Sequence, residues 1–187
     1  MITATFITGN QKKVLSAQEA LKGFDIKLEQ EKLETPEIQD KDIKKVAEYS
    51  ARFAAEKLNK PVVKVDVGFE IEALNGFPGP FSKYINEWLK PEKILSMLEG
   101  EKNRKAKFID VVAYCEPGKD PVSFTTETKG EIDTKAQGEN GWGIDQIFIP
   151  DGYKSPLATL ENKDRVKVWG KDHWVNFARF VSGNSNG

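Results

Sequence analysis

The sequence has little cysteine and little histidine, and both scarcities limit the chemistry that the chain can carry. Cys115 is the single cysteine in 187 residues, which excludes an internal disulfide framework and suits a reducing compartment. His173 is the single histidine. Histidine-rich metal sites and serine–histidine hydrolase triads are therefore disfavoured, because each needs histidine at the reacting centre. Any catalysis is expected to use carboxylates, lysines and a hard metal ion.

Long apolar runs and an excess of one charge are also lacking. No stretch approaches the roughly 20 apolar residues of a membrane span. Residues 2–7 are apolar but too short for a signal peptide, and no charged leader precedes them. We therefore expect a cytoplasmic protein that does not contact membranes. The net charge of −1 and the pI near 6.0 give no support for a general nucleic-acid binder.

What is present is an ordinary globular composition, with 39% hydrophobic and 30% charged residues. A chain of this length is expected to form one domain, or one domain built as two lobes. Apolar periodicity and turn residues predict strands at residues 2–7, 24–28, 62–65 and 69–74, a hairpin of strands at 108–114 and 122–128, and a strand at 144–149 ended by Pro150. Helices are predicted at residues 11–22 and 42–58, and two more within 84–98 are broken at Pro91. A helical stretch over 163–180 is expected to have one aromatic face that includes a packed His173, and a disordered tail is expected at 183–187.

The first candidate site follows the first expected strand. Thr8-Gly9-Asn10 leads directly into the helix at residues 11–22, and the asparagine is a good N-cap. A glycine turn at a helix N-terminus binds anions, because free N–H groups and the helix dipole point at the ligand. Lys12 and Lys13 oppose the dipole, which makes sense if one of them holds a phosphate. The alternative is an ordinary capped helix with surface lysines.

The second candidate site lies in the middle of the chain. A valine-rich strand at residues 62–65 delivers Asp66 to an expected glycine corner, after which residues 69–74 form a second strand. Residues 75–80 are dense in turn-forming residues, and Lys83 follows them. An acid that can hold a metal and a lysine that can meet an anion suggest a phosphate site. The alternative is a buried strand, a hairpin corner and a solvated lysine.

Two loops supply further candidates. The polar loop at residues 30–40 carries four acids, and one of them can point into a cleft, although spacing does not say which. The glycine-rich loop at residues 138–143 carries Trp142. A tryptophan on such a loop can stack on a base, or it can cover the core as a lid.

Several motifs together resemble those of one enzyme family, in its order along the chain. They are Thr8-Gly9-Asn10 with Lys13, Glu37-Ile38-Gln39, Asp66-x-Gly68, Ala73-Leu74-Asn75-Gly76-Phe77-Pro78-Gly79-Pro80 with Lys83, Gly141-Trp142-Gly143-Ile144-Asp145, and Phe148-Ile149-Pro150-Asp151-Gly152-Tyr153. The family is that of the inosine triphosphate pyrophosphatases, which hydrolyse non-standard purine nucleoside triphosphates to monophosphate and pyrophosphate. The resemblance covers nearly the whole chain.

The resemblance implies an α/β fold with two lobes, a long twisted mixed β-sheet flanked by helices, and a nucleotide cleft between the lobes. It also implies a Mg²⁺ cofactor and a homodimer. Glu37 and Asp66 would hold the metal, and Asp66 would also orient or deprotonate the attacking water. Trp142 would stack on the base, with Asp145 near its edge. The positions that match the family's substrate contacts are Thr8, Gly9, Asn10, Lys13, Val67, Lys83, Trp142, Gly143, Ile144, Asp145, Lys163, Val168 and Trp169.

The sequence departs from the family pattern at three places. Val65 stands where the family has a second acid, and Val67 stands where it has a small hydroxyl residue. Lys167-Val168-Trp169 replaces a Ser-His-Arg block whose His-Arg pair reads the purine oxygen at position six. We therefore expect either an active enzyme with altered base preference or a catalytically weak or inactive nucleotide-binding protein. Trp169 is expected to supply a second stacking surface or simply more core.

Overall fold

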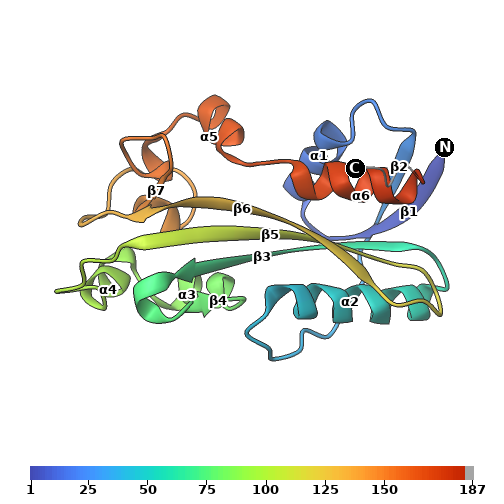
Figure 1. Cartoon of the computed structure of the whole chain (residues 1–187), viewed down its shortest axis with the longest axis horizontal. Coiled ribbons are helices and arrows are strands. Elements are labelled where there is room, and N and C mark those ends of the chain that lie inside the picture. Colours follow the sequence, from blue (N-terminus) through green and yellow to red (C-terminus); the bar gives the residue numbers. More distant parts are fainter. Residues whose placement is uncertain (184–187) are drawn as a thin grey trace. The chain divides into compact units, whose positions relative to one another are not determined.

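The computed structural model describes residues 1–183 (Figure 1). Of the tail expected to be disordered at residues 183–187, residues 184–187 lie outside the described residues. The chain divides into two compact units. Unit 1 consists of residues 1–66, 110–126 and the chain from Lys171 onward, and unit 2 consists of residues 67–109 and 127–170. No helix within residues 1–183 is long and apolar enough to cross a membrane.

The secondary structure is a mixed sheet with helices. The strands are β1 (Ile2–Ile7), β2 (Ile26–Glu31), β3 (Val62–Ile71), β4 (Pro78–Gly79), β5 (Lys105–Cys115), β6 (Val122–Ile132) and β7 (Phe148–Pro150). The helices are α1 (Gln11–Ala20), α2 (Ile43–Leu58), α3 (Ser82–Trp88), α4 (Pro91–Ser96), α5 (Asn162–Val168) and α6 (Asp172–Val181), with short 3₁₀ turns η1 (Glu72–Leu74), η2 (Ile144–Gln146) and η3 (Leu157–Thr159).

The sheet has seven strands in the order β2-β1-β3-β5-β6-β7, with β4 paired to β3. The pairs of β1 with β2 and with β3 are parallel, whereas β3–β4 and β6–β7 are antiparallel. The α/β fold with a mixed sheet is therefore confirmed, and β2 lies at one edge of the sheet. The organisation of the whole chain as a single domain of two lobes stays a prediction.

Unit 1 has a core between its strands and helices α1 and α6. Phe6 from β1 packs edge-to-face on Trp174 from α6, with ring centroids 5.6 Å apart. In Figure 1, α1 and α6 lie on one side of the unit 1 strands and α2 lies on the other. Asp42 caps α2 by accepting the Lys44 N–H at 2.9 Å, and the buried face of α2 is rich in alanine. The helix predicted at residues 42–58 is thus confirmed.

Unit 2 has its own core, which is mainly aromatic and aliphatic. Phe69 packs on Phe108 and Phe148, with ring centroids 4.5 Å and 5.5 Å away. Pro91 begins α4 and separates it from α3, as predicted, because proline fits the first turn of a helix but not its interior.

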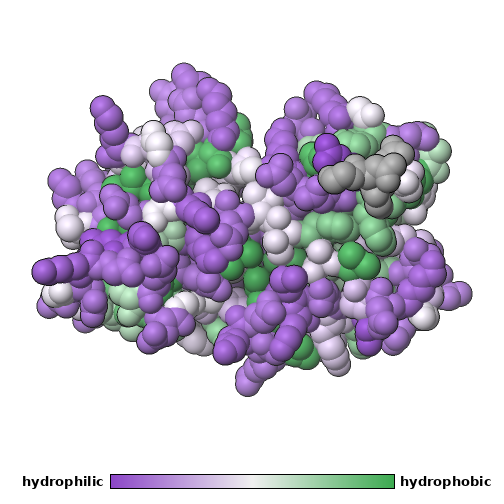
Figure 2. Space-filling model, in the orientation of Figure 1, coloured by the Kyte–Doolittle hydropathy of each residue, from purple (hydrophilic) through white to green (hydrophobic). Residues whose placement is uncertain are grey.

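Hydrophilic side chains predominate on the face of the molecule seen in Figure 2, in keeping with the 30% of charged residues.

Two strands differ from their predicted bounds. β3 is one continuous strand of ten residues, so Asp66 lies in its middle and Gly68 makes no corner. The β-branched valines on both sides of Asp66 keep the backbone extended. The chain reverses later, at Asn75 and Gly76, whose φ angles are 53° and 87°. Of the strand expected at residues 144–149, only Phe148–Pro150 is extended, because η2 occupies the preceding residues.

The predicted C-terminal helical stretch with one aromatic face is also wrong. The chain forms two helices, α5 and α6, with Trp169 in an extended conformation between them. Trp169 belongs to the core of unit 2, whereas His173 and Phe177 are buried in unit 1. Aromatic spacing alone did not reveal the break, which Gly170 favours because glycine is a poor helix former.

The packing predicted for His173 is confirmed, and it leads to a pH-dependent stability. The side chain is 6% exposed, and its Nδ1 lies 2.7 Å from Thr126 Oγ1. Burial lowers the pKa of His173 to about 4, although Asp172 opposes the shift. The unfolded chain has a histidine pKa of about 6.5, so the unfolded state takes up the proton first as the pH falls. The stability that neutral His173 contributes is therefore complete above about pH 6.5 and is lost towards pH 4.

We expect His173→Phe to weaken this acid sensitivity, because phenylalanine keeps the ring and removes the titration. Between pH 7 and pH 4, the wild type should lose about 3 kcal/mol more unfolding free energy than the variant. Urea denaturation at a series of pH values measures the difference. Parallel stability curves for the two proteins would show that His173 does not titrate in this way.

Candidate functional site

The turn between β1 and α1 forms a capped helix N-terminus in unit 1. The Asn10 side chain accepts the Lys12 N–H at 2.9 Å, and the Asn10 N–H donates to Thr8 Oγ1 at 3.0 Å. The predicted cap is therefore confirmed. Gly9 and Asn10 are exposed and Thr8 is half-buried. The Lys13 N–H also has an acceptor in the turn, the Asn10 carbonyl oxygen at 3.1 Å, so an anion at this end of α1 would meet the Gln11 N–H and the positive end of the helix dipole.

Lys13 turns towards the sheet rather than into solvent. Its Nζ donates to the backbone oxygen of Val65 at 2.8 Å, so α1 reaches β3 next to Asp66. Burial lowers the pKa of Lys13, while the negative charges of Asp66 and Glu37 act in the opposite direction. The structure therefore brings three predicted site residues into one electrostatic environment. A lysine held in this way is a preorganised cation for a phosphate oxygen.

Two carboxylates of unit 1 have buried oxygens without partners. Asp66 Oδ2 and Asp110 Oδ2 are both buried and accept no hydrogen bond within residues 1–183. Burial raises the pKa of Asp110 to about 6, and the charge of Lys13 opposes this rise. Asp110 lies on β5, which neighbours β3 in the sheet. Sequence analysis missed Asp110, although one acid within the apolar run at residues 108–114 is a recognisable signal.

The donors present in unit 1 fit a hard divalent cation. Buried carboxylate oxygens without partners are costly unless a cation or a donor meets them. Within residues 1–183, no three histidine, cysteine, aspartate or glutamate side chains form a ready metal site. Glu37 is exposed on the loop after β2. Mg²⁺ commonly takes one or two carboxylates and completes its shell with water and phosphate oxygens, so Asp66 and Glu37 are sufficient in kind.

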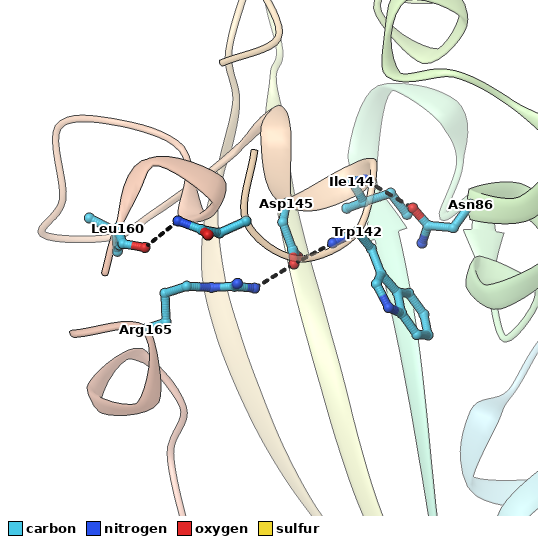
Figure 3. A network of polar contacts seen from close by, with 7 residues as sticks. Asn86, Trp142, Ile144, Asp145, Leu160 and Arg165 are labelled. Atoms are coloured by element: carbon cyan, nitrogen blue, oxygen red, sulfur yellow. Dashed lines mark hydrogen bonds and ion pairs between the residues drawn. The ribbon is translucent and has the colours of Figure 1, made fainter. Parts of the chain in front are cut away.

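The Trp142 loop in unit 2 is fixed by one buried carboxylate. Asp145 Oδ2 accepts two hydrogen bonds, one from the Trp142 N–H at 2.9 Å and one from Arg165 Nη2 at 2.6 Å (Figure 3). Burial raises the pKa of Asp145, whereas the Trp142 N–H and the Arg165 guanidinium act to lower it. The buried Ile144 donates its N–H to Asn86 Oδ1 at 2.9 Å, which ties the loop to α3.

Trp142 itself is not a lid over the core. Its side chain is 58% exposed, so a ring face is available for stacking. Lys83, Trp142 and Gly143 line one surface cavity of about 300 Å³, together with Asn86 and Glu87. The structure therefore brings Lys83 and the Trp142 loop together within unit 2, although the two are about 60 residues apart in the sequence.

The C-terminal candidates of unit 2 are less suited to a ligand. Trp169 packs edge-to-face on Phe108, with ring centroids 5.2 Å apart, which makes it core rather than a second stacking surface. Val168 and Val67 pack against the same core. Lys163 is exposed and pairs with Glu161 at 2.8 Å. Val67 and Val168 carry no side-chain donor, and the one indole N–H of Trp169 is neutral, unlike the charged planar fork of an arginine.

Sequence analysis also missed Arg165 and Asn86. Both act through long-range contacts, Arg165 with Asp145 and Asn86 with Ile144. Neither residue belongs to a motif, and no local spacing marks it. Only the tertiary arrangement of unit 2 reveals that they hold the Trp142 loop.

Comparisons with known proteins agree with the fold and the motifs. A sequence model described as the Ham1 family matches residues 4–171. A protein named dITP/XTP pyrophosphatase from Methanopyrus kandleri is 47% identical over 163 residues, which is 87% of each chain. A protein of the same name from Methanosarcina acetivorans is 43% identical over 163 residues, covering 87% of this chain and 88% of its own. The structure of a HAM1 protein from Coxiella burnetii superposes with a TM-score of 0.83 at 25% identity, over 98% of this chain and 100% of that one.

The family match, the long alignments and the structural similarity all extend over most of the chain, in agreement with the resemblance inferred from the motifs. The chain therefore belongs to the Ham1 family.

Proposed function

We propose that this protein is a Mg²⁺-dependent nucleoside triphosphate pyrophosphatase that hydrolyses non-canonical purine nucleoside triphosphates to monophosphate and pyrophosphate. The observation that carries the proposal is that two features lie next to each other in unit 1. Asp66 has a buried oxygen that accepts no hydrogen bond within residues 1–183, and Lys13, in the first turn of the capped helix α1, turns its Nζ to the neighbouring Val65 carbonyl. Relatives at 43% and 47% identity, named dITP/XTP pyrophosphatases, support the same reaction class. Cytoplasmic residence and a homodimeric state are part of this proposal.

The reaction needs little covalent chemistry from the protein. Cleavage between the α- and β-phosphates requires a positioned water and neutralisation of charge on the phosphate oxygens. Asp66 accepts a proton from the attacking water, and its partner-free oxygen is the acceptor. Lys13 and the N-terminal end of α1 bind phosphate oxygens. Glu37 and Asp66 would hold Mg²⁺, which would supply further charge neutralisation and would lower the pKa of a bound water.

The proposed roles of the unit 2 residues concern the base and a phosphate oxygen. The exposed ring of Trp142 stacks on the base, since aromatic rings bind the π-face of any base. The loop backbone at Gly143 and Ile144 lines the base, and Asp145 lies at its edge. Lys83 neutralises phosphate charge from the same surface cavity as Trp142, and Lys163 is a further cation.

The second candidate function is a nucleotide-binding protein with weak or no catalysis. Val65 and Val67 favour it, because they replace an acid and a hydroxyl next to Asp66. The retention of Asp66, Glu37, Lys13 and Lys83 favours the enzyme. If the wild type binds nucleotides without hydrolysing them and Val65→Glu creates activity, the missing acid is the reason.

A panel of nucleotides tests the proposed function. We expect pyrophosphate release in the presence of Mg²⁺ from ITP, XTP or dITP. We also expect a preference for ITP over GTP of less than about tenfold, because at the family's base-reading positions Val168 provides no side-chain donor and Trp169 provides only one neutral indole N–H. Steady-state assays with coupled pyrophosphate detection measure both. No turnover at high enzyme concentration, with nucleotide binding intact, would reject the enzyme in favour of the binding protein.

A further inference from the structure

The loop between β2 and α2 carries Glu37 and has no regular secondary structure. Within residues 1–183, residues 32–41 form no hydrogen bond between backbone groups. A segment without backbone hydrogen bonds keeps one position only where side chains hold it. The place of the Glu37 carboxylate therefore depends on the side-chain contacts that the loop makes with the strands and helices of unit 1.

Two such contacts hold the residues just before Glu37. Lys64 Nζ donates to Thr35 Oγ1 at 3.0 Å, and Ser50 Oγ donates to the Pro36 backbone oxygen at 3.1 Å. Ser50 lies on α2 and is fully buried, whereas Lys64 lies on β3. The loop is thus fastened to a helix and to a strand immediately before the carboxylate that the proposed function assigns to the metal.

Lys64 connects the loop with the strand that carries Asp66. Side chains alternate between the two faces of a strand, so Lys64 and Asp66, two residues apart on β3, lie on the same face. Val63 and Val65 point to the other face, into the core of unit 1. The contact of Lys64 with the loop therefore brings the loop to the face of β3 on which Asp66 lies.

The charge and the hydrogen bond of Lys64 have opposite effects on a metal at this place. Burial lowers the pKa of Lys13, the charge of Asp66 opposes this shift, and the charge of Lys64 adds to it, so Lys64 lies among the charged groups of the candidate site. An ammonium group repels a divalent cation. The charge of Lys64 alone would weaken metal binding, whereas its hydrogen bond to Thr35 would strengthen it by holding the loop.

We propose that Lys64 is a positioning residue, which through Thr35 holds the loop in the place where Glu37 can bind the metal. Thr35 is the one hydrogen-bond partner of the Lys64 side chain within residues 1–183. Lys64 acts through the loop and is not itself a ligand. The inference rests on the proposed function, in that Glu37 and Asp66 are the protein ligands of Mg²⁺. The buried Ser50 is a second support of the same loop.

Binding of Mn²⁺ in the absence of nucleotide tests this role. Mn²⁺ takes the same kind of oxygen ligands as Mg²⁺, and electron paramagnetic resonance of the free ion measures its affinity for the protein. Thr35→Val removes the acceptor of the Lys64 hydrogen bond and changes no charge. We expect this variant to bind Mn²⁺ about 3- to 10-fold more weakly, because one hydrogen bond to a charged group no longer holds the loop.

Lys64→Met distinguishes the hydrogen bond from the charge by the direction of its effect. If Lys64 acts only through its charge, the variant binds Mn²⁺ more tightly than the wild type, because a repelling charge is gone. If Lys64 positions the loop, the variant binds Mn²⁺ more weakly. We expect weaker binding, although the loss should be smaller than in Thr35→Val because the repulsion is removed as well.

Matched variants separate positioning from other effects. Lys60→Met removes an exposed lysine whose Nζ lies 4.0 Å from a carboxylate oxygen of Glu31, and it should change Mn²⁺ affinity by less than about twofold. In a Glu37→Gln background, Thr35→Val should have no further effect on Mn²⁺ affinity, because the loop then carries no charged ligand to position.

Trypsin cleavage reports on the loop itself. The loop offers cleavage sites after Lys32 and Lys41. Cleavage at these sites should become faster in Thr35→Val and in Lys64→Met than in the wild type, because a loosened loop reaches the protease more readily. The thermal midpoints should stay close to that of the wild type, which shows that the variants are folded.

Three results would overturn the assignment of Lys64. They are an unchanged Mn²⁺ affinity in Thr35→Val, tighter Mn²⁺ binding in Lys64→Met, and a full effect of Thr35→Val in the Glu37→Gln background. A wild type that binds no Mn²⁺ would overturn it as well. Absence of pyrophosphate release, with Mn²⁺ affinities that follow the expected pattern, counts against the proposed function alone, because this titration requires no hydrolysis.

Discussion

Asp66→Asn should lower the rate of pyrophosphate release by about 1,000-fold, which is within the range of a lost general base. Asparagine has nearly the same shape as aspartate but carries no negative charge and accepts no proton from water. Since Asp66 Oδ2 has no partner within residues 1–183, the substitution breaks no hydrogen bond at that oxygen. Nucleotide affinity should therefore change far less than turnover. Steady-state kinetics and calorimetry on the same preparation separate the two effects.

The matched control for this prediction is Asp120→Asn. Asp120 also belongs to unit 1, but it is almost fully exposed and pairs with Arg52 at 2.6 Å on the surface. Its loss should leave turnover and stability nearly unchanged, because exposed ion pairs contribute little. If Asp66→Asn retains turnover comparable to that of Asp120→Asn, Asp66 is not the acceptor of the water proton.

Gly138→Ala should destabilise the protein by about 3 kcal/mol, the sum of a strained backbone and a steric overlap. The φ angle of Gly138 is +84°, and a Cβ there would overlap the backbone carbon and oxygen of Ala158. Backbone atoms cannot rotate away as a side chain can. The Asn140 N–H also donates to the Ala158 oxygen at 3.1 Å, so relief of the overlap would disturb the start of the Trp142 loop. Urea denaturation measures the loss.

Gly152→Ala isolates the backbone contribution to that loss. Gly152 has a φ angle of +83°, but no atom lies within 4 Å of an added Cβ. Its substitution should cost about 1 kcal/mol, the strain of a left-handed conformation alone. The difference between the two variants then measures the overlap with Ala158. Equal losses would show that the segment carrying Ala158 yields to the extra methyl group.

The retained and the lost family residues fall into different environments of this chain. Lys13 and Asp66 lie together in unit 1, with an additional buried acid at Asp110 on the neighbouring strand. The replaced base-reading residues Val168 and Trp169 pack as core in unit 2. This distribution explains why the proposed function keeps the reaction of the family while the base preference is expected to be altered.

The sequence by itself determined the features that depend on neighbouring residues. Asn10 caps α1, Pro91 separates two helices, and the apolar period of α2 marks its buried face, because each depends on interactions within a few residues. The motif order along the chain was also sufficient to predict the family. The sequence did not indicate that β3 runs straight through Asp66, because a glycine such as Gly68 after an apolar run is compatible both with a continuous strand and with a corner.

Only the tertiary structure decided which distant residues meet. The contact of Lys13 with the Val65 carbonyl and the ion pair of Arg165 with Asp145 join residues 52 and 20 positions apart. Asp66 and Asp110 lie on neighbouring strands of the sheet. Such contacts depend on strand order and on the direction of each side chain, and neither follows from local propensity. The same reason explains why Trp169 joined one core and His173 another, although their spacing fits one helical face.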